Sequence, residues 1–217
     1  CYIDEPFRIT MLKGQEELPK DFDENEINLL LKRPRKNDTY GQWRNWVITK
    51  WILATGNREA TICNMQIDDL NFQKKEIILN RTKNKQVQVV PLSAELEKAL
   101  KEYINMWGIE KWLFPATTGN KLTTNALRKS YTVYCKSRGV NHANLHGLRH
   151  SFAREWIKNN GDVFKLQQLL GHKTLEMTRH YVKIYGEDLK QDFNKYSPLD
   201  TLTRKSKRTR EIKRKDE

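Results

Sequence analysis

Six side chains of this 217-residue chain have the types that can bind a phosphate, move protons and attack phosphorus. They are two arginines, two histidines, a lysine and a tyrosine: Arg58, Arg149, His146, His172, Lys83 and Tyr181. A guanidinium binds two phosphate oxygens at once, and an imidazole accepts a proton from a hydroxyl. A tyrosine hydroxyl has an ordinary pKa of about 10, so it attacks at neutral pH only beside a base or a strong positive potential. We therefore interpret the six as a candidate site for metal-free phosphodiester cleavage.

The spacing of four of these residues predicts how they are presented. His146 and Arg149 are three residues apart, so at a helix start they share one face. Thr174 is a suitable N-cap for the helix that carries Tyr181, which places His172 in the turn before that helix. The site is thus expected to draw on at least two helix starts.

Apolar periodicity predicts the elements that carry these residues. Helices are expected at 21–31, 39–54, 58–65, 94–106, 123–138, 147–159, 162–170, 174–185 and 187–195. A period of two predicts short strands at 76–80 and 86–91, with Lys83 and Lys85 on the turn between them. The predicted fold class is α+β, mainly α-helical with a small antiparallel sheet.

The charge of the chain indicates a polyanionic partner. Its 40 Lys and Arg against 27 Asp and Glu give a net charge of +13 and an isoelectric point near 9.6. The last fifteen residues account for only five of these charges, so the body is basic in its own right. No apolar run approaches the roughly 20 residues of a membrane span, and we expect no membrane partner. Three cysteines without zinc-site spacing fit a reducing cytoplasm.

Five stretches of the chain carry a resemblance to a known family. They are Ala54–Arg58, Lys83 with Val89–Leu92, Leu145–Ala153, Leu169–His172 and Tyr181. The chain resembles the catalytic domain of a tyrosine recombinase of the phage integrase family. The match runs from Leu18 to Tyr185 with the intervals between the motifs preserved.

The resemblance implies a reaction and a role for each residue. Tyr181 would attack the scissile phosphate of duplex DNA, forming a 3′-phosphotyrosyl link and a free 5′ hydroxyl. The resemblance assigns phosphate binding to Arg58 and Arg149, the role of general base to His146 and that of general acid to Lys83. It assigns His172 a hydrogen bond to the phosphate. No metal, nucleotide or other cofactor is implied. The distance to Pro91 within the family pattern favours Lys83 over Lys85 as the acid.

The resemblance also predicts a domain organisation. Residues 1–20 would be the linker from an N-terminal DNA-binding domain, and 21–186 the catalytic domain. Residues 187–202 would be a C-terminal segment exchanged between protomers or packed within its own chain. The charge of residues 203–217, apart from the resemblance, predicts a basic, disordered tail.

The expected partners are double-stranded DNA, other protomers in a tetrameric synapse on DNA, and an excision accessory factor. We expect a bacterial or phage-encoded cytoplasmic recombinase that integrates or excises a mobile element. Arg128 and Lys129 are further candidate contacts to the DNA backbone, alongside Lys85, and a solvated basic face is the alternative for Arg128 and Lys129.

Alternatives to this assignment remain open. Relatives often carry a carboxylate three residues after the first arginine, where this chain has Thr61, and the nearest acid is Glu59. His142, His146 and His150 recur every four residues as a metal site would, but Gly147 is expected to interrupt that helix. A topoisomerase of type IB would use related chemistry without exchanging partners. A DNA-binding regulator would keep the fold and lose catalysis.

Overall fold

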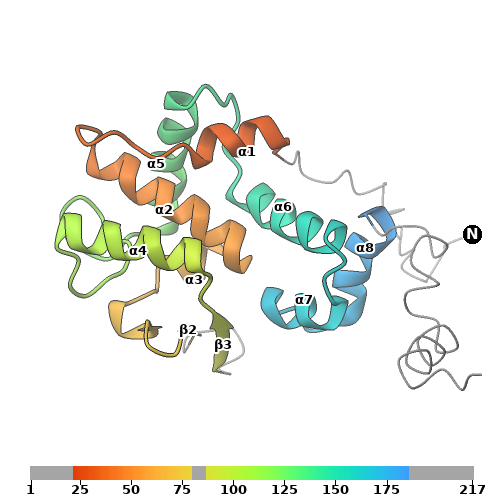
Figure 1. The fold of residues 1–217 in the computed structure, drawn as a ribbon. Coiled ribbons are helices and arrows are strands. Elements are labelled where there is room, and N and C mark those ends of the chain that lie inside the picture. Colours follow the sequence, from red (N-terminus) through yellow and green to blue (C-terminus); the bar gives the residue numbers. More distant parts are fainter. Residues whose placement is uncertain (1–21, 80–86, 186–217) are drawn as a thin grey trace, which may run out of the picture. The chain divides into compact units, whose positions relative to one another are not determined.

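The computed structural model describes residues 22–79 and 87–185. The chain divides into two compact units, Cys1–Ala153 and Arg154–Glu217, and each is described by itself. Figure 1 shows the elements of both units along the sequence. The predicted linker 1–20, helix 187–195, segment 187–202 and tail 203–217 lie outside the described residues. No described helix is long and apolar enough to cross a membrane.

The helix α2, Tyr40–Thr55, is the centre of the first unit. It begins at a capping box between Thr39 and Gln42 and ends where Gly56 adopts a left-handed φ of 64°. Trp43, Val47 and Trp51 recur at helical spacing on one face of this helix and are fully buried. Ile48 and Ile52 widen this face and are equally buried, so the helix packs on more than one side.

Three helices pack against α2: α1 (Glu24–Leu31), α4 (Ala94–Trp107) and α5 (Thr124–Ser137). Polar contacts fix α5 on α2. Arg44 Nη2 donates to Ser130 Oγ at 3.0 Å, and the hydroxyls of Thr49 and Tyr131 lie 2.9 Å apart. All four side chains are at least part-buried, so these bonds set how α5 lies on α2 and where its exposed face begins.

The small sheet has three antiparallel strands, β1 (Leu70–Asn71), β2 (Glu76–Leu79) and β3 (Gln88–Pro91), in that order. Ile77 pairs with Val90, and both side chains are buried. The sequence predicted β2 and β3 but not β1, nor the 3₁₀ turn Ile67–Asp69 before it. A two-residue strand is too short to give a period, which explains the omission. The turn that carries Lys83 and Lys85 lies outside the described residues.

Four further helices complete the described chain: α3 (Glu59–Ile62), α6 (Leu145–Lys158), α7 (Val163–Leu170) and α8 (Leu175–Tyr185). The expectation that Gly147 interrupts the helical pattern is wrong, because Gly147 lies inside α6. Its carbonyl accepts a hydrogen bond from Ser151 Oγ at 3.1 Å. A single glycine lowers helix stability but does not end a helix that is buried on one face. The helix therefore starts two residues earlier than predicted, at Leu145.

Candidate active site

The end of α2 forms the first part of the site. Gly56 terminates the helix in the left-handed region, where a side chain would be strained. The N–H of Asn57 then donates to Thr55 Oγ1 at 3.3 Å, and the Thr55 hydroxyl donates to the carbonyl of Trp51 at 2.8 Å. Arg58 follows as the N-cap residue of α3 with an exposed side chain. The Thr55 hydrogen bonds before Arg58 and the start of α3 after it thus fix the backbone that carries the Arg58 side chain.

Arg149 joins this turn from the other end of the first unit. Its side chain is 3% exposed, and Nη1 donates to the carbonyl oxygen of Gly56 at 2.6 Å. The bond links residues 93 positions apart in the sequence. A buried guanidinium needs such acceptors, because an uncompensated buried charge is strongly destabilising. One turn therefore positions both arginines of the candidate site, because it carries Arg58 and its Gly56 carbonyl binds Arg149.

His146 lies at the start of α6, one turn before Arg149. Its backbone N–H donates to Asn144 Oδ1 at 3.1 Å, so Asn144 caps the helix. The imidazole is exposed, and its ring centre lies 4.6 Å from that of His150 in an edge-to-face arrangement. As predicted, His146 and Arg149 are both in the first turns of one helix, but Asn144 was not recognised from the sequence as its cap.

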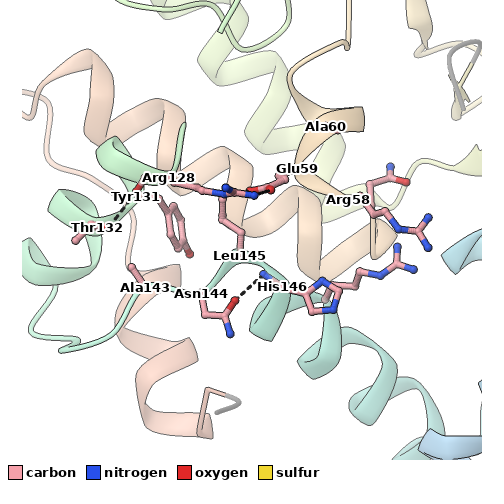
Figure 2. Close-up of a pocket in the computed structure, with 12 residues that line it drawn as sticks. Arg58, Glu59, Ala60, Arg128, Tyr131, Thr132, Ala143, Asn144, Leu145 and His146 are labelled. Carbon is pink, nitrogen blue, oxygen red and sulfur yellow. Dashed lines mark hydrogen bonds and ion pairs between the residues drawn. The ribbon is translucent and has the colours of Figure 1, made fainter. Parts of the chain in front are cut away.

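These residues line one pocket of about 480 Å³. Arg58, His146 and Arg149 all contribute to its wall, and Figure 2 shows Arg58 and His146 on the same side of the view. The rest of the lining comes from the turn before α3, from α3, α5, the segment before α6 and the first residue of α6: Asn57, Glu59, Ala60, Arg128, Tyr131, Thr132, Ala143, Asn144 and Leu145. Two guanidinium groups and an imidazole at one cavity suit an anionic oxygen ligand.

An ion pair between Glu59 and Arg128 belongs to the same pocket (Figure 2). Arg128 Nε donates to Glu59 Oε2 at 2.9 Å, and this hydrogen bond raises the pKa of the guanidinium. Glu59, the acid nearest to Thr61, is therefore paired with α5. Lys129, on the same helix, is exposed. The contact between Glu59 and Arg128 spans 69 residues and could not be inferred from spacing.

The second unit holds His172 and Tyr181 on a helix–turn–helix. Gly171 ends α7 with a φ of 60°, and His172 follows in the turn before α8. The Nδ1 atom of His172 lies 2.9 Å from the hydroxyl oxygen of Thr178, whose side chain is fully buried. The rings of His172 and Tyr181 are nearly parallel, with centres 6.4 Å apart. Tyr181 is 5% exposed.

Thr178 is the residue that sequence reasoning missed in this unit. It precedes Tyr181 by three positions on α8, so both side chains share a face of the helix. Helical spacing could have found it as a partner for a side chain in the preceding turn. The predicted placement of His172 before the helix of Tyr181 agrees with the structure.

Within the part of the chain that the structure describes, no group of three or more His, Cys, Asp or Glu residues is placed to hold a metal ion. His142 lies instead beside α1, where its ring stacks on Phe22 with centres 4.5 Å apart. Its Nδ1 atom is 3.4 Å from Glu26 Oε1. The recurrence of histidines every four residues thus has a packing explanation at its first position.

The sequence of residues 20–187 matches the model of the phage integrase family. The chain belongs to this family. Among its relatives, tyrosine recombinase XerC of Pediococcus pentosaceus is 30% identical over 209 residues, which cover 90% of this chain and 68% of that protein. Tyrosine recombinase XerC of Corynebacterium glutamicum is 27% identical over 199 residues, which cover 90% of this chain and 64% of the relative. The chain thus spans about two thirds of the length of these relatives.

Solved structures give the same result for the fold. The crystal structure of XerA recombinase superposes with a TM-score of 0.65 at 24% identity, covering 86% of this chain and 66% of that one. A post-cleavage complex of XerH site-specific recombinase with palindromic difH substrate gives 0.65 at 25% identity, covering 79% and 52%. The Tn1549 transposon integrase bound to a circular intermediate DNA gives 0.66 at 18% identity, covering 91% and 68%. The predicted fold class and the family resemblance are confirmed.

Proposed function

We propose that this chain is the catalytic part of a site-specific DNA recombinase that cuts and rejoins strands through Tyr181. The observation that carries the proposal is the pocket shared by Arg58, His146 and Arg149. Its chemistry is that of a phosphate-binding site, and the family's relatives are named tyrosine recombinases. The net charge of +13 supports a polyanionic substrate.

The proposed reaction exchanges one phosphoester bond for another. The Tyr181 oxygen attacks the scissile phosphorus, and the bond from phosphorus to the 5′ oxygen of the next nucleotide breaks. His146 accepts the phenol proton, and Lys83 delivers a proton to the departing 5′ oxygen. Arg58 and Arg149 neutralise the non-bridging oxygens as charge builds in the five-coordinate state, and His172 donates a further hydrogen bond. A 5′ hydroxyl from another duplex then reverses these steps.

The phosphotyrosyl ester conserves the energy of the broken phosphodiester. The proposed reaction therefore balances without a nucleotide, a redox partner or a metal ion.

The finer parts of the proposal concern partners and biological role. We infer a tetrameric synapse on duplex DNA, an excision accessory factor, and integration or excision of a mobile element in a bacterial cytoplasm. The family resemblance supports these points, and the recombinase–DNA complexes among the similar structures are consistent with a DNA partner. Exposed Lys129 and the paired Arg128 are proposed contacts to the DNA backbone, together with Lys85.

A trapping experiment tests the proposal. The chain is incubated with a pool of nicked duplexes of random sequence, designed so that the 5′ fragment diffuses away after cleavage. Protein that carries covalent DNA is recovered under denaturing conditions, and the DNA is sequenced. We expect an adduct with wild type, none with Tyr181→Phe, and no inhibition by EDTA. An adduct that survives Tyr181→Phe would assign the nucleophile elsewhere.

Further assays distinguish recombination from two alternatives. Joining of strands from two different duplexes supports recombination, whereas relaxation of supercoiled DNA without joining supports a topoisomerase of type IB. Tight sequence-specific binding with no adduct from wild type would favour a regulator that has lost catalysis.

A further inference from the structure

Asn57 stands out among the residues of the pocket. Asn57 is one of the residues that line the cavity, with Arg58, His146 and Arg149, yet it is only 6% exposed. The amide nitrogen Nδ2 is buried and has no hydrogen-bond partner among the described residues. Neither the proposed mechanism nor the sequence motifs assign Asn57 a role.

A buried donor without an acceptor is costly, so such atoms are few in folded proteins and call for an explanation. The neighbouring groups do not supply the acceptor, because the cations of Arg58 and Arg149 are themselves donors. An anionic oxygen in the pocket would supply it. A phosphate has two non-bridging oxygens and two ester oxygens. It can therefore accept a hydrogen bond from this amide as well as from the two guanidinium groups.

The position of Asn57 is fixed before any ligand binds. Its N–H is held by the Thr55 hydroxyl at 3.3 Å, and the preceding carbonyl, of Gly56, accepts from Arg149 at 2.6 Å. The following residue is Arg58. The amide is therefore part of the same short turn that positions both arginines, and a phosphate bound between them would lie within reach of that turn.

We propose that the Asn57 side-chain amide donates a hydrogen bond to the scissile phosphate and is a further catalytic residue of this pocket. The inference rests on the proposed function and adds a fourth donor group to the phosphate-binding set. In the free protein the amide is held buried and unsatisfied, and the DNA phosphate satisfies it.

Asn57→Leu tests the contact, because leucine has a similar size and no donor. On the duplex recovered by trapping, single-turnover cleavage should fall about 10- to 100-fold, the range for one hydrogen bond to a charged group. The melting temperature of the free protein should stay the same or rise, because an unsatisfied buried donor is removed. The matched control is Asn64→Leu, since Asn64 lies one helix away, donates to the Ala60 carbonyl at 2.7 Å and is not in the pocket lining.

A second measurement separates a phosphate contact from a structural role. In the Tyr181→Phe background, which cannot cleave, Asn57→Leu should weaken binding to the recovered duplex severalfold. The weakening should disappear when an uncharged methylphosphonate replaces the scissile phosphate. Equal weakening on both duplexes would overturn the contact, as would wild-type cleavage by Asn57→Leu. If the wild-type chain forms no adduct, the proposed function itself is contradicted. If the wild type is active and Asn57→Leu is equally active, only the role of Asn57 is contradicted.

Discussion

The two units of the chain position their candidate residues by different means. In the first unit, Arg149 is held by the carbonyl of Gly56 from 93 residues away, and α2, α3 and α6 must all be in place to form the pocket. In the second, His172 bonds Thr178 only six residues away, and Tyr181 follows on the same helix. The proposed phosphate-binding residues thus depend on long-range packing, whereas the proposed nucleophile is presented by local helical geometry.

This difference predicts that substitutions in the two units have different effects on stability and on cleavage. Loss of a long-range contact in the first unit affects both stability and chemistry, because the same guanidinium binds a backbone carbonyl and faces the pocket. Loss of a local contact in the second unit affects mainly the orientation of one ring. Four substitutions or conditions test this comparison.

The largest effect is expected for Arg149→Ala. Removing this proposed phosphate-binding cation should lower the cleavage rate about 100- to 1,000-fold, as loss of one transition-state donor does. It also leaves the buried Gly56 carbonyl without its donor, so the free energy of unfolding should fall by about 1–3 kcal/mol. Arg58→Ala is the control, because Arg58 is exposed: cleavage should fall comparably with a much smaller change in stability. Denaturant unfolding and single-turnover cleavage measure both, and equal stability of the two variants would contradict the comparison.

Alkaline pH should weaken the first unit selectively. Burial raises the pKa of the Cys63 thiol to about 11 and that of Cys135 to about 12, so both stay protonated in the folded state while unfolded thiols ionise near 9. Because the pKa of each thiol is higher in the folded state, its contribution to the free energy of unfolding is fully present below pH 9 and is lost as pH rises toward 11. The loss for Cys63 should be about 2–3 kcal/mol.

Denaturant unfolding from pH 8 to 11 measures this loss, with Cys63→Ala as the comparison. The variant should start less stable but show a shallower decline with pH. Chain positions 154–217 contain no cysteine, so the second unit contributes no such term. An unchanged slope in Cys63→Ala would contradict the assignment.

Thr178→Val in the second unit is expected to lower the rate of cleavage by up to about tenfold. The hydroxyl that meets His172 Nδ1 at 2.9 Å is lost, so the imidazole no longer has a set orientation toward the phosphate. One neutral hydrogen bond corresponds to a decrease in cleavage of up to about tenfold. Thr178→Ser keeps the hydroxyl and should cleave like wild type. If the valine and serine variants were equally slow, the effect would come from packing at this fully buried position.

The smallest effect is expected at the exposed pair of Glu59 and Arg128. Glu59→Gln removes a carboxylate from the pocket wall and frees Arg128 to meet a phosphate, so DNA binding at low salt should strengthen about two- to fivefold. Arg128→Gln should weaken binding by a similar factor and reduce its dependence on salt. Stability should change little in either variant, since exposed ion pairs contribute little. Affinity titrations at two salt concentrations measure both, and weaker binding by Glu59→Gln would argue for a structural pair.

Local sequence patterns were sufficient for most of the fold. The helices predicted at 39–54, 94–106 and 162–170 are found at Tyr40–Thr55, Ala94–Trp107 and Val163–Leu170, so their ends agree within one or two residues. The exceptions are instructive. Gly147 sits inside α6, and the short β1 and the 3₁₀ turn before it carried no usable period. In each case packing against neighbouring segments outweighed a weak local preference.

The sequence by itself determined which residue types stand at which intervals, and therefore the family, the helical presentation of His146 with Arg149 and the turn that holds His172 before Tyr181. These are properties of residues close together in the chain, where helix geometry converts spacing into position. Only the tertiary structure decided that Arg149 binds the Gly56 carbonyl, that Glu59 pairs with Arg128, and that Asn57 brings a buried, unsatisfied amide to the pocket. Those facts depend on contacts between segments tens of residues apart, and no local pattern records which buried polar atoms find a partner.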